Sequence, residues 1–225
     1  MLRSSVTAMV IAVMLATYVR TFLVEPVRIV SGSMEPTLLP GDHILVNRFG
    51  LSAHKGLPGP LAALLPVRDL QRGDVVVFRL AFSPYENRVK RCLGLPGDEV
   101  GIRDHGLWID GRRVDESGYV QISNPIPPGP SDRLGEASGR HGPGHLWNLR
   151  EDRFFCLGDH RDHSRDSRSW GPVPRTGLRG RAFLVYWSTR LGQPEEQPAG
   201  WGKIGHLLFF RLSRTRWHRC FQGIE

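Results

Sequence analysis

The sequence predicts a mainly β protein, with an N-terminal transmembrane helix followed by an antiparallel β-barrel- or sandwich-like domain that carries a small inserted β/loop region. Three observations predict this class. An uncharged apolar stretch runs from Ser4 to Val19. Short segments rich in β-branched and aromatic residues follow, with glycine and proline between them. Helical periodicity is weak in the rest of the chain.

The apolar stretch is expected to be a membrane anchor. The sixteen residues from Ser4 to Val19 would span about 24 Å as a helix, whereas a bilayer core is about 30 Å thick. If the Arg20 side chain snorkels outward, the span extends to Val24. Arg3 and the amino terminus favour a cytoplasmic N-terminus.

A cleaved signal peptide is the competing interpretation of this segment, with Arg3 as its charged start. No small-x-small cleavage site follows, because the bulky Tyr18, Val19 and Arg20 come next. We therefore favour an uncleaved single-pass anchor, and both interpretations export the remainder of the chain.

The strands are predicted from composition and turn signals. Asp110-Gly111 between two apolar segments is a strong signal for a tight hairpin. The expected strands cover residues 42–49, 74–80, 87–93, 107–109, 112–114, 153–157 and 181–187.

Three regions are expected along the chain: an anchor over 1–24, a β-rich domain over 25–190 with an insert at about 105–150, and a basic tail over 191–225. Residues 52–68 and 124–146 are rich in proline or glycine and predict loops. The tail carries several arginines with Trp217 and Phe221, so it either lies in an anionic membrane interface or frays as a basic end.

The formal charge of +8 raises the question of nucleic-acid binding. The basic residues are scattered and fit no helix-turn-helix, zinc-finger or RNA-binding pattern, so we expect no nucleic-acid partner. A surface held against anionic lipid explains the charge at least as well. Lysine occurs only at Lys55, Lys90 and Lys203, which makes a lysine among apolar residues notable.

The cysteines are Cys92, Cys156 and Cys220. The odd number and the absence of a C-x-x-C spacing exclude a three-bridge framework and a structural zinc site. One disulfide and buried free thiols both remain open for Cys92 and Cys156.

Three segments carry the candidate chemistry. Residues 31–38 read Ser-Gly-Ser-Met-Glu-Pro-Thr-Leu, residues 89–98 read Val-Lys-Arg-Cys-Leu-Gly-Leu-Pro-Gly-Asp, and residues 158–168 read Gly-Asp-His-Arg-Asp-His-Ser-Arg-Asp-Ser-Arg. A serine hydroxyl needs a base, and no Ser–His–Asp pattern is present. A lysine kept neutral by burial can also serve as the base for a serine, because burial lowers the pKa of lysine.

Residues 158–168 also admit a metal site or a charged turn. The aspartates and histidines of this segment fit neither the EF-hand nor the His-Glu-x-x-His spacing, and we expect no metal or cofactor. The alternative is a turn held by internal ion pairs, with Asp166 and Arg168 as partners. The acidic and histidine residues concerned are Asp159, His160, Asp162, His163 and Asp166.

Together the three segments, in this order, resemble the bacterial type I signal peptidases, membrane-bound Ser–Lys endopeptidases. The resemblance covers Val19 to about Pro174 and implies Ser33 as nucleophile and Lys90 as general base. It implies that Ser31 supports the oxyanion and that the remaining site residues, Ser164, Asp166 and Arg168, orient the base and brace its loop. The chain departs from the family pattern at His160 and His163, where asparagine is usual, and at Glu35.

The resemblance implies hydrolysis of exported preproteins at small-x-small sites on the extracytoplasmic side of the bacterial inner membrane. An extended substrate would pair with a strand, for which residues 27–30 are the candidate. The alternatives are a specialised processing peptidase of the same family and a non-catalytic, membrane-tethered β module that binds peptides.

Overall fold

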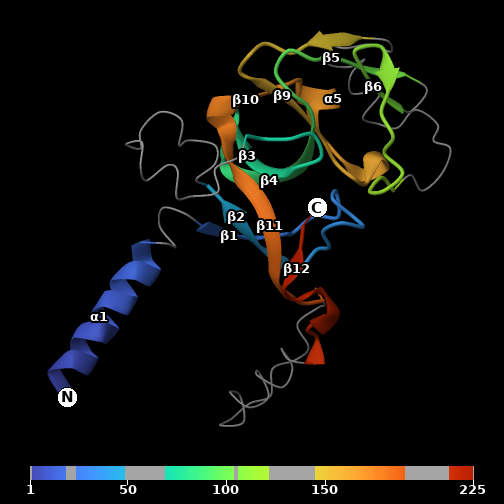
Figure 1. Cartoon of the computed structure of the whole chain (residues 1–225). Helices are drawn as coiled ribbons and strands as arrows, with labels where there is room; N and C mark the ends of the chain where they lie inside the picture. Colours follow the sequence, from blue (N-terminus) through green and yellow to red (C-terminus); the bar gives the residue numbers. More distant parts are fainter. Residues whose placement is uncertain are drawn as a thin grey trace.

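A computed structural model describes residues 2–18, 24–48, 69–103, 106–121, 145–190 and 213–224. The first element is a helix, α1 (Leu2–Tyr18), which lies at the predicted anchor and extends away from the β strands in Figure 1. In the described part of the chain, no helix combines the length and the apolar character that crossing a bilayer requires. The expected loop at 52–68, most of that at 124–146 and the first part of the tail lie outside the described residues.

Two antiparallel sheets form the rest of the fold (Figure 1). The larger sheet has eight strands in the order β1-β2-β11-β3-β4-β9-β10, with β12 paired to β11. Its strands are β1 (Val24–Arg28), β2 (Asp42–Asn47), β3 (Val75–Leu80), β4 (Ser83–Gly94), β9 (Arg153–Leu157), β10 (Val173–Pro174), β11 (Leu178–Ser188) and β12 (Gln222–Gly223).

The smaller sheet has four strands in the order β7-β6-β5-β8. It is built from β5 (Glu99–Arg103), β6 (Gly106–Ile109), β7 (Arg112–Arg113) and β8 (Leu146–Asn148). Asp110 and Gly111 form the turn between β6 and β7 with positive φ angles of 50° and 73°, as the Asp-Gly signal predicts. Short helical turns complete the fold, namely η3 (Arg161–His163), α5 (Ser167–Trp170), η4 (Arg175–Gly177) and η5 (Trp217–Arg219).

The larger sheet is buried on both faces at β3, which explains the run of four apolar residues at 75–78. Val75 and Val77 pack into one cluster with residues of β1, β2 and β11, whereas Val76 and Phe78 pack into another with residues of β4 and β9. A third cluster lies between the two sheets' strands, where Leu93 and Phe155 meet Val100 of β5. These clusters fix β4, the strand that carries Lys90, between β3 and β9.

The mainly β, antiparallel class is confirmed, but the barrel-like arrangement is wrong. The strand order of the larger sheet ends at β1 on one side and at β10 on the other, and no described strand joins these ends. Composition predicts where strands occur, whereas closure of a sheet depends on twist and register that composition does not carry.

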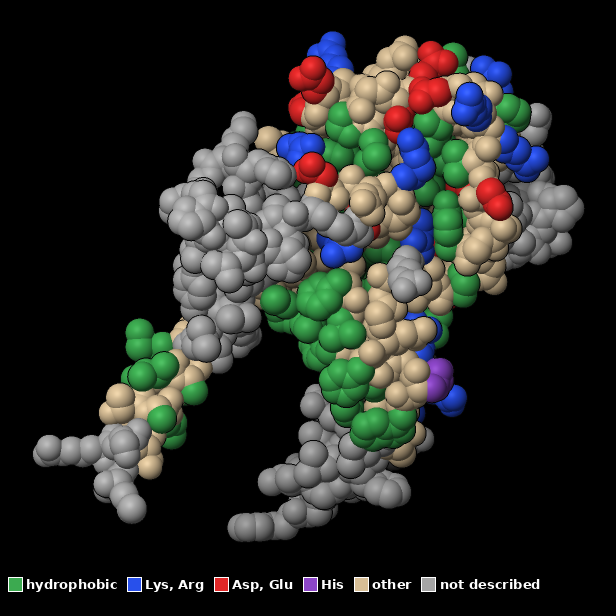
Figure 2. Space-filling view, viewed as in Figure 1, with side chains coloured by type: hydrophobic (Ala, Val, Ile, Leu, Met, Phe, Trp, Pro, Cys, Tyr) green, Lys and Arg blue, Asp and Glu red, His purple; other side chains and the backbone are tan. Residues whose placement is uncertain are grey.

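Hydrophobic side chains also remain on the surface. Figure 2 shows them gathered over β11, β12 and η5, and along α1. Trp217 and Phe221, which adjoin β12, are 58% and 76% exposed. Exposed aromatic residues in one region indicate a surface that contacts another apolar phase or partner.

Candidate active site

The turn that follows β1 presents Ser33. The Ile29 N–H donates to the Asp42 carbonyl at 2.8 Å, which prolongs the pairing of β1 with β2. The Leu38 N–H donates to the Met34 carbonyl at 2.8 Å. Met34 and Leu38 are buried in the core, so they fix the segment that directly follows the serine.

Lys90 lies on β4, opposite Val76 of β3, and its amine contacts the serine directly. The distance from Lys90 Nζ to Ser33 Oγ is 2.5 Å. The Lys90 side chain is only 5% exposed. Burial lowers the pKa of Lys90 from 10.5 to about 8, against the opposing effect of the Asp166 carboxylate and with a smaller contribution from the Arg88 charge. The amine is therefore within reach of the hydroxyl, and its pKa is close to the working pH, as a general base requires.

Ser31 lies at the open side of this pair. Its Oγ is 3.4 Å from Ser33 Oγ, and the residue is exposed. The Ser33 N–H donates to no other described residue, whereas the Ser33 carbonyl accepts from the His160 N–H at 3.2 Å. A hydroxyl and an N–H beside a nucleophile are the donors that an oxyanion requires.

Ser164 lies next to the pair without bonding to the amine. Its Oγ is buried, and among the described residues Lys90 Nζ donates to Ser33 Oγ and not to Ser164. Gly158 separates the two serines: a Cβ built on Gly158 would lie 2.1 Å from Ser164 Oγ and 2.6 Å from the Ser33 carbonyl oxygen. The expected hydrogen bond between Ser164 and the amine is thus not formed among the described residues, although Ser164 lies at the site.

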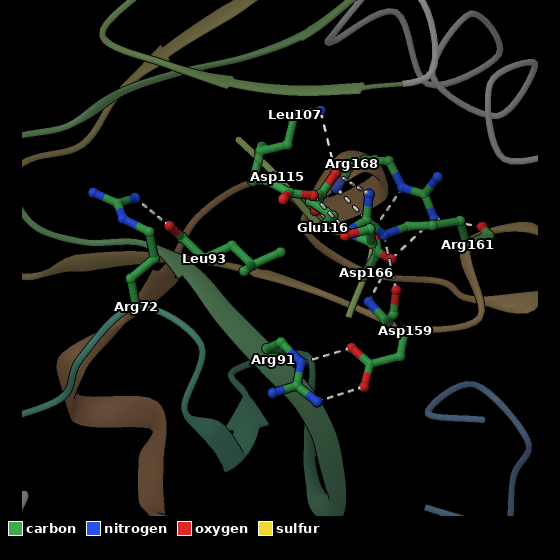
Figure 3. A network of polar contacts seen from close by, with 12 residues as sticks. Arg72, Arg91, Leu93, Leu107, Asp115, Glu116, Asp159, Arg161, Asp166 and Arg168 are labelled. Carbon is green, nitrogen blue, oxygen red and sulfur yellow. Dashed lines mark hydrogen bonds and ion pairs between the residues drawn. The ribbon is translucent and has the colours of Figure 1, made fainter. Parts of the chain in front are cut away.

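Asp166 and Arg168 brace the loop that carries Ser164. Asp166 is fully buried and accepts hydrogen bonds from the Gly158 N–H at 3.0 Å and from Arg168 Nε at 2.8 Å. Arg168 Nη2 also donates to the Ser164 carbonyl at 3.3 Å. Burial opposes ionisation, but the Arg168 charge and these hydrogen bonds outweigh it, so the pKa of Asp166 is lowered. Figure 3 shows the pair inside a wider polar network.

Sequence reasoning missed the second buried ion pair of the site. Arg91 donates to both Asp159 oxygens, from Nε at 2.9 Å and from Nη2 at 2.8 Å (Figure 3). Thr37 donates to Asp159 Oδ2 at 2.6 Å, so the pair ties the serine turn to β4 and to the 158–168 loop. The sequence feature that could have indicated this pair is Arg91, a charged residue directly after the candidate base. The structure shows that β4 is buried from Lys90 to Gly94, so a charge there needs a partner.

The same network joins the small sheet to the site. Arg161 forms a buried ion pair with Glu116, which follows β7 (Figure 3). Gln121 donates its N–H to the Asp159 carbonyl at 3.0 Å, and the Arg91 guanidinium lies 4.3 Å from the Tyr119 ring. Residues 116–121 thereby cover the loop that holds Asp159 and Asp166.

Among the residues that the structure describes, no group of three or more potential metal ligands converges. The carboxylates of Asp159 and Asp166 face arginines instead. His160 and His163 contact each other, with 3.1 Å between Nε2 and Nδ1.

Gly158→Ala is expected to lower activity at least about tenfold and to destabilise the fold by about 1–3 kcal/mol, because its Cβ would press on Ser164 and on the Ser33 carbonyl. Gly118→Ala is the matched control, since nothing lies within 4 Å of its Cβ. Peptide cleavage rates and thermal unfolding of both variants test this. Equal behaviour of the two would contradict the crowding at Gly158.

Comparison with known proteins gives the family. The family model for signal peptidase, peptidase S26, matches residues 2–187. Signal peptidase I of Pseudomonas aeruginosa is 37% identical over 198 residues, covering 75% of this chain and 66% of that protein. Signal peptidase I of Pseudomonas fluorescens is 38% identical over 193 residues, with coverages of 75% and 66%. The probable signal peptidase I-2 of Synechocystis is 34% identical over 184 residues, with coverages of 80% and 70%.

The match thus spans slightly less than two thirds of the two Pseudomonas proteins, at 66% of each. The match to the family model includes all three segments that carry Ser33, Lys90 and Asp166, because it extends from residue 2 to residue 187. The predicted resemblance is confirmed, and the chain belongs to the signal peptidase family, peptidase S26.

Proposed function

We propose that this chain is a serine endopeptidase that removes signal peptides from exported preproteins by means of Ser33 and Lys90. The observation that carries the proposal is the 2.5 Å contact between Lys90 Nζ and Ser33 Oγ inside a buried site. Family membership supports the substrate class, since the matched relatives are named signal peptidases.

In the proposed reaction, neutral Lys90 takes the proton of the Ser33 hydroxyl as Oγ attacks the scissile carbonyl carbon. The resulting oxyanion accepts hydrogen bonds from the Ser31 hydroxyl and the Ser33 N–H. The Lys90 ammonium then gives its proton to the leaving amine, which releases the mature protein and leaves the signal peptide esterified to Ser33. Lys90 next deprotonates a water that hydrolyses this ester, and the serine is restored.

The remaining site residues act through the base and its loop in this proposal. Ser164 limits where the amine and Ser33 can lie, because only Gly158 separates it from the serine. Asp166 and Arg168 hold the backbone around Ser164. A buried scaffold held by hydrogen bonds of this kind keeps the reacting atoms in position.

An extended substrate is proposed to pair alongside the segment that leads into the serine. β1 is an edge strand, and on its outer side it pairs with no other described strand. Val30 lies just beyond β1, is 74% exposed and precedes Ser31 directly. Residues 27–30 therefore offer main-chain groups for β-augmentation next to the nucleophile.

Attachment to the bacterial cytoplasmic membrane is part of the proposal, with residues 1–24 as the anchor and the β domain on the extracytoplasmic side. The apolar side chains of α1 support it, because Met9, Ile11 and Met14 are each about 60% exposed or more. The exposed Trp217 and Phe221 suit the same interface.

The test is incubation of the purified chain in detergent with a preprotein, followed by mapping of the cut by mass spectrometry. A single cut after a small-x-small site, absent in Ser33→Ala, is expected. Binding of the preprotein without any turnover would instead identify a non-catalytic peptide-binding module. A cut at an unrelated motif would identify a specialised processing peptidase.

The pH dependence follows from the base. Only the neutral amine accepts a proton, and the pKa of Lys90 is about 8, so kcat/KM should rise with pH around a midpoint near 8. Below that midpoint the rate should fall about tenfold for each pH unit, because one protonation removes the base. Initial rates on a peptide substrate across the stable pH range measure this. A rate that stays constant through pH 8 would contradict Lys90 as the base.

A further inference from the structure

Two thiols that the proposed reaction does not use face each other beside the base. Cys92 on β4 pairs directly with Cys156 on β9, and both residues are completely buried. Lys90 precedes Cys92 by two positions on the same strand, so the two side chains share one face of the sheet. In the described structure all three cysteines are free thiols.

The backbone hydrogen bonds show which kind of cross-strand pair this is. The Cys92 N–H donates to the Asp74 carbonyl at 2.8 Å, and the Cys92 carbonyl accepts from the Gly73 N–H at 2.8 Å. The Cys156 N–H donates to Ser167 Oγ at 3.0 Å. The backbone groups of the two cysteines thus bond away from each other, which defines a non-hydrogen-bonded pair.

Such pairs place side chains at their closest approach. In antiparallel sheets the Cα atoms of a non-hydrogen-bonded pair lie about 4.5 Å apart. Disulfides span Cα separations of about 4.4–6.8 Å. Cys92 and Cys156 therefore meet the distance requirement through their register alone, without a rearrangement of the sheet.

We propose that Cys92 and Cys156 form a disulfide in an oxidising environment and that this bond staples β4 to β9 beside Lys90. The bond would join the strand of the base to the strand that leads into the 158–168 loop. It would also close a loop that contains the whole small sheet, and long closed loops gain most from a crosslink. The expectation of an oxidising compartment rests on the proposed function, whereas the register of Cys92 and Cys156 does not depend on it.

The disulfide would form by two thiol–disulfide exchanges with a small disulfide such as oxidised glutathione. One cysteine thiolate attacks the glutathione disulfide and releases a glutathione thiol. The second cysteine then attacks the mixed disulfide and releases the other glutathione. The protein loses two protons and two electrons, and the glutathione disulfide gains them.

The native sheet should slow this exchange. A hydrogen bond from Cys92 and burial both raise the pKa of Cys156, so little thiolate exists while the strands are closed. We therefore expect the bond to form during folding or when β9 opens transiently, and to form faster in sub-denaturing urea.

The test uses the full-length Cys220→Ala protein in detergent, which keeps only the paired cysteines. Cys220 is partly exposed and remote from the pair in sequence, so its removal simplifies the readout. After incubation with oxidised glutathione, the protein is denatured and alkylated, and its mass is measured by mass spectrometry. We expect no alkylated cysteine and a mass about 2 Da below that of the reduced, unalkylated protein. Two alkylated cysteines, or a single glutathione adduct, would overturn the proposal.

Stability supplies a second, independent readout. The oxidised protein should melt roughly 5–15 °C higher than its reduced form. Cys156→Ala in the same background has no second thiol, so oxidant should leave its Tm unchanged. A bond that forms without raising Tm would overturn the stapling role. Neither readout requires peptidase activity, so failure of this proposal is distinguishable from failure of the proposed function.

Discussion

Lys90→Arg is expected to abolish cleavage, with a loss of at least about 10²–10⁴-fold in kcat. Arginine keeps the positive charge and is at least as long as lysine, but its guanidinium stays protonated at any working pH. It therefore cannot take the proton from the Ser33 hydroxyl, 2.5 Å from the native amine. Single-turnover cleavage of a preprotein by the purified variant measures the loss directly.

A second variant separates loss of the base from loss of the fold. Lys90 is almost fully buried, so the larger arginine also crowds its surroundings. Lys90→Met keeps the volume and removes the charge, and burial disfavours that charge in the native protein. We expect Lys90→Met to be equally inactive while melting at or above the native Tm below pH 8. Full activity in either variant would exclude Lys90 as the base.

The strands and the proximity of the candidate pair could be expected from the sequence, because they depend on local composition and on recognisable segments. Val75–Leu80 and Leu178–Ser188 form strands where β-branched and aromatic residues are dense. Ser33 and Lys90 were expected to act together because residues 31–38 and 89–98 resemble the matching segments of type I signal peptidases.

The burial of Lys90 was not predictable from its own strand. Alternation places Arg88, Lys90 and Cys92 on one face of β4, yet their environments differ. Arg88 lies at the more open part of the strand, with its guanidinium 5.0 Å from the Trp170 ring. From Lys90 onward β4 is buried without interruption, because β3 and β9 flank it there. Tertiary neighbours, and not periodicity, thus set the pKa of the base.

The register of the cysteines and the ion pair between Arg91 and Asp159 required the structure for a similar reason. Cys92 and Cys156 are far apart in sequence, and only the pairing of β4 with β9 brings them together. Asp159 was one of the residues considered as a metal ligand, although no metal was expected, because a carboxylate in a charged segment can bind either a metal or an arginine. Its actual partner, Arg91, is fixed by long-range strand order.

Asp159→Ala is expected to be the most destabilising single change at the site, at about 3–5 kcal/mol. The side chains of Arg91 and Asp159 are only 2% and 1% exposed. Removal of the carboxylate would leave the guanidinium buried without its charge partner and Thr37 without its acceptor at 2.6 Å. Because Thr37 follows the nucleophile in the same turn, activity should fall together with stability. Thermal unfolding and peptide cleavage of the purified variant test both effects.

The energetic origin of this loss is testable with two further variants. Glu86→Ala removes a surface ion pair with Arg88. The Glu86 side chain is 67% exposed, so this loss should cost no more than about 1 kcal/mol of stability. The double substitution of Arg91 by Met and Asp159 by Leu removes both buried charges, so it should be less destabilising than Asp159→Ala alone. If the double variant is the less stable of the two, packing and Thr37 contribute more than the unpaired charge. If Asp159→Ala costs no more than Glu86→Ala, the buried pair does not hold the serine turn to β4.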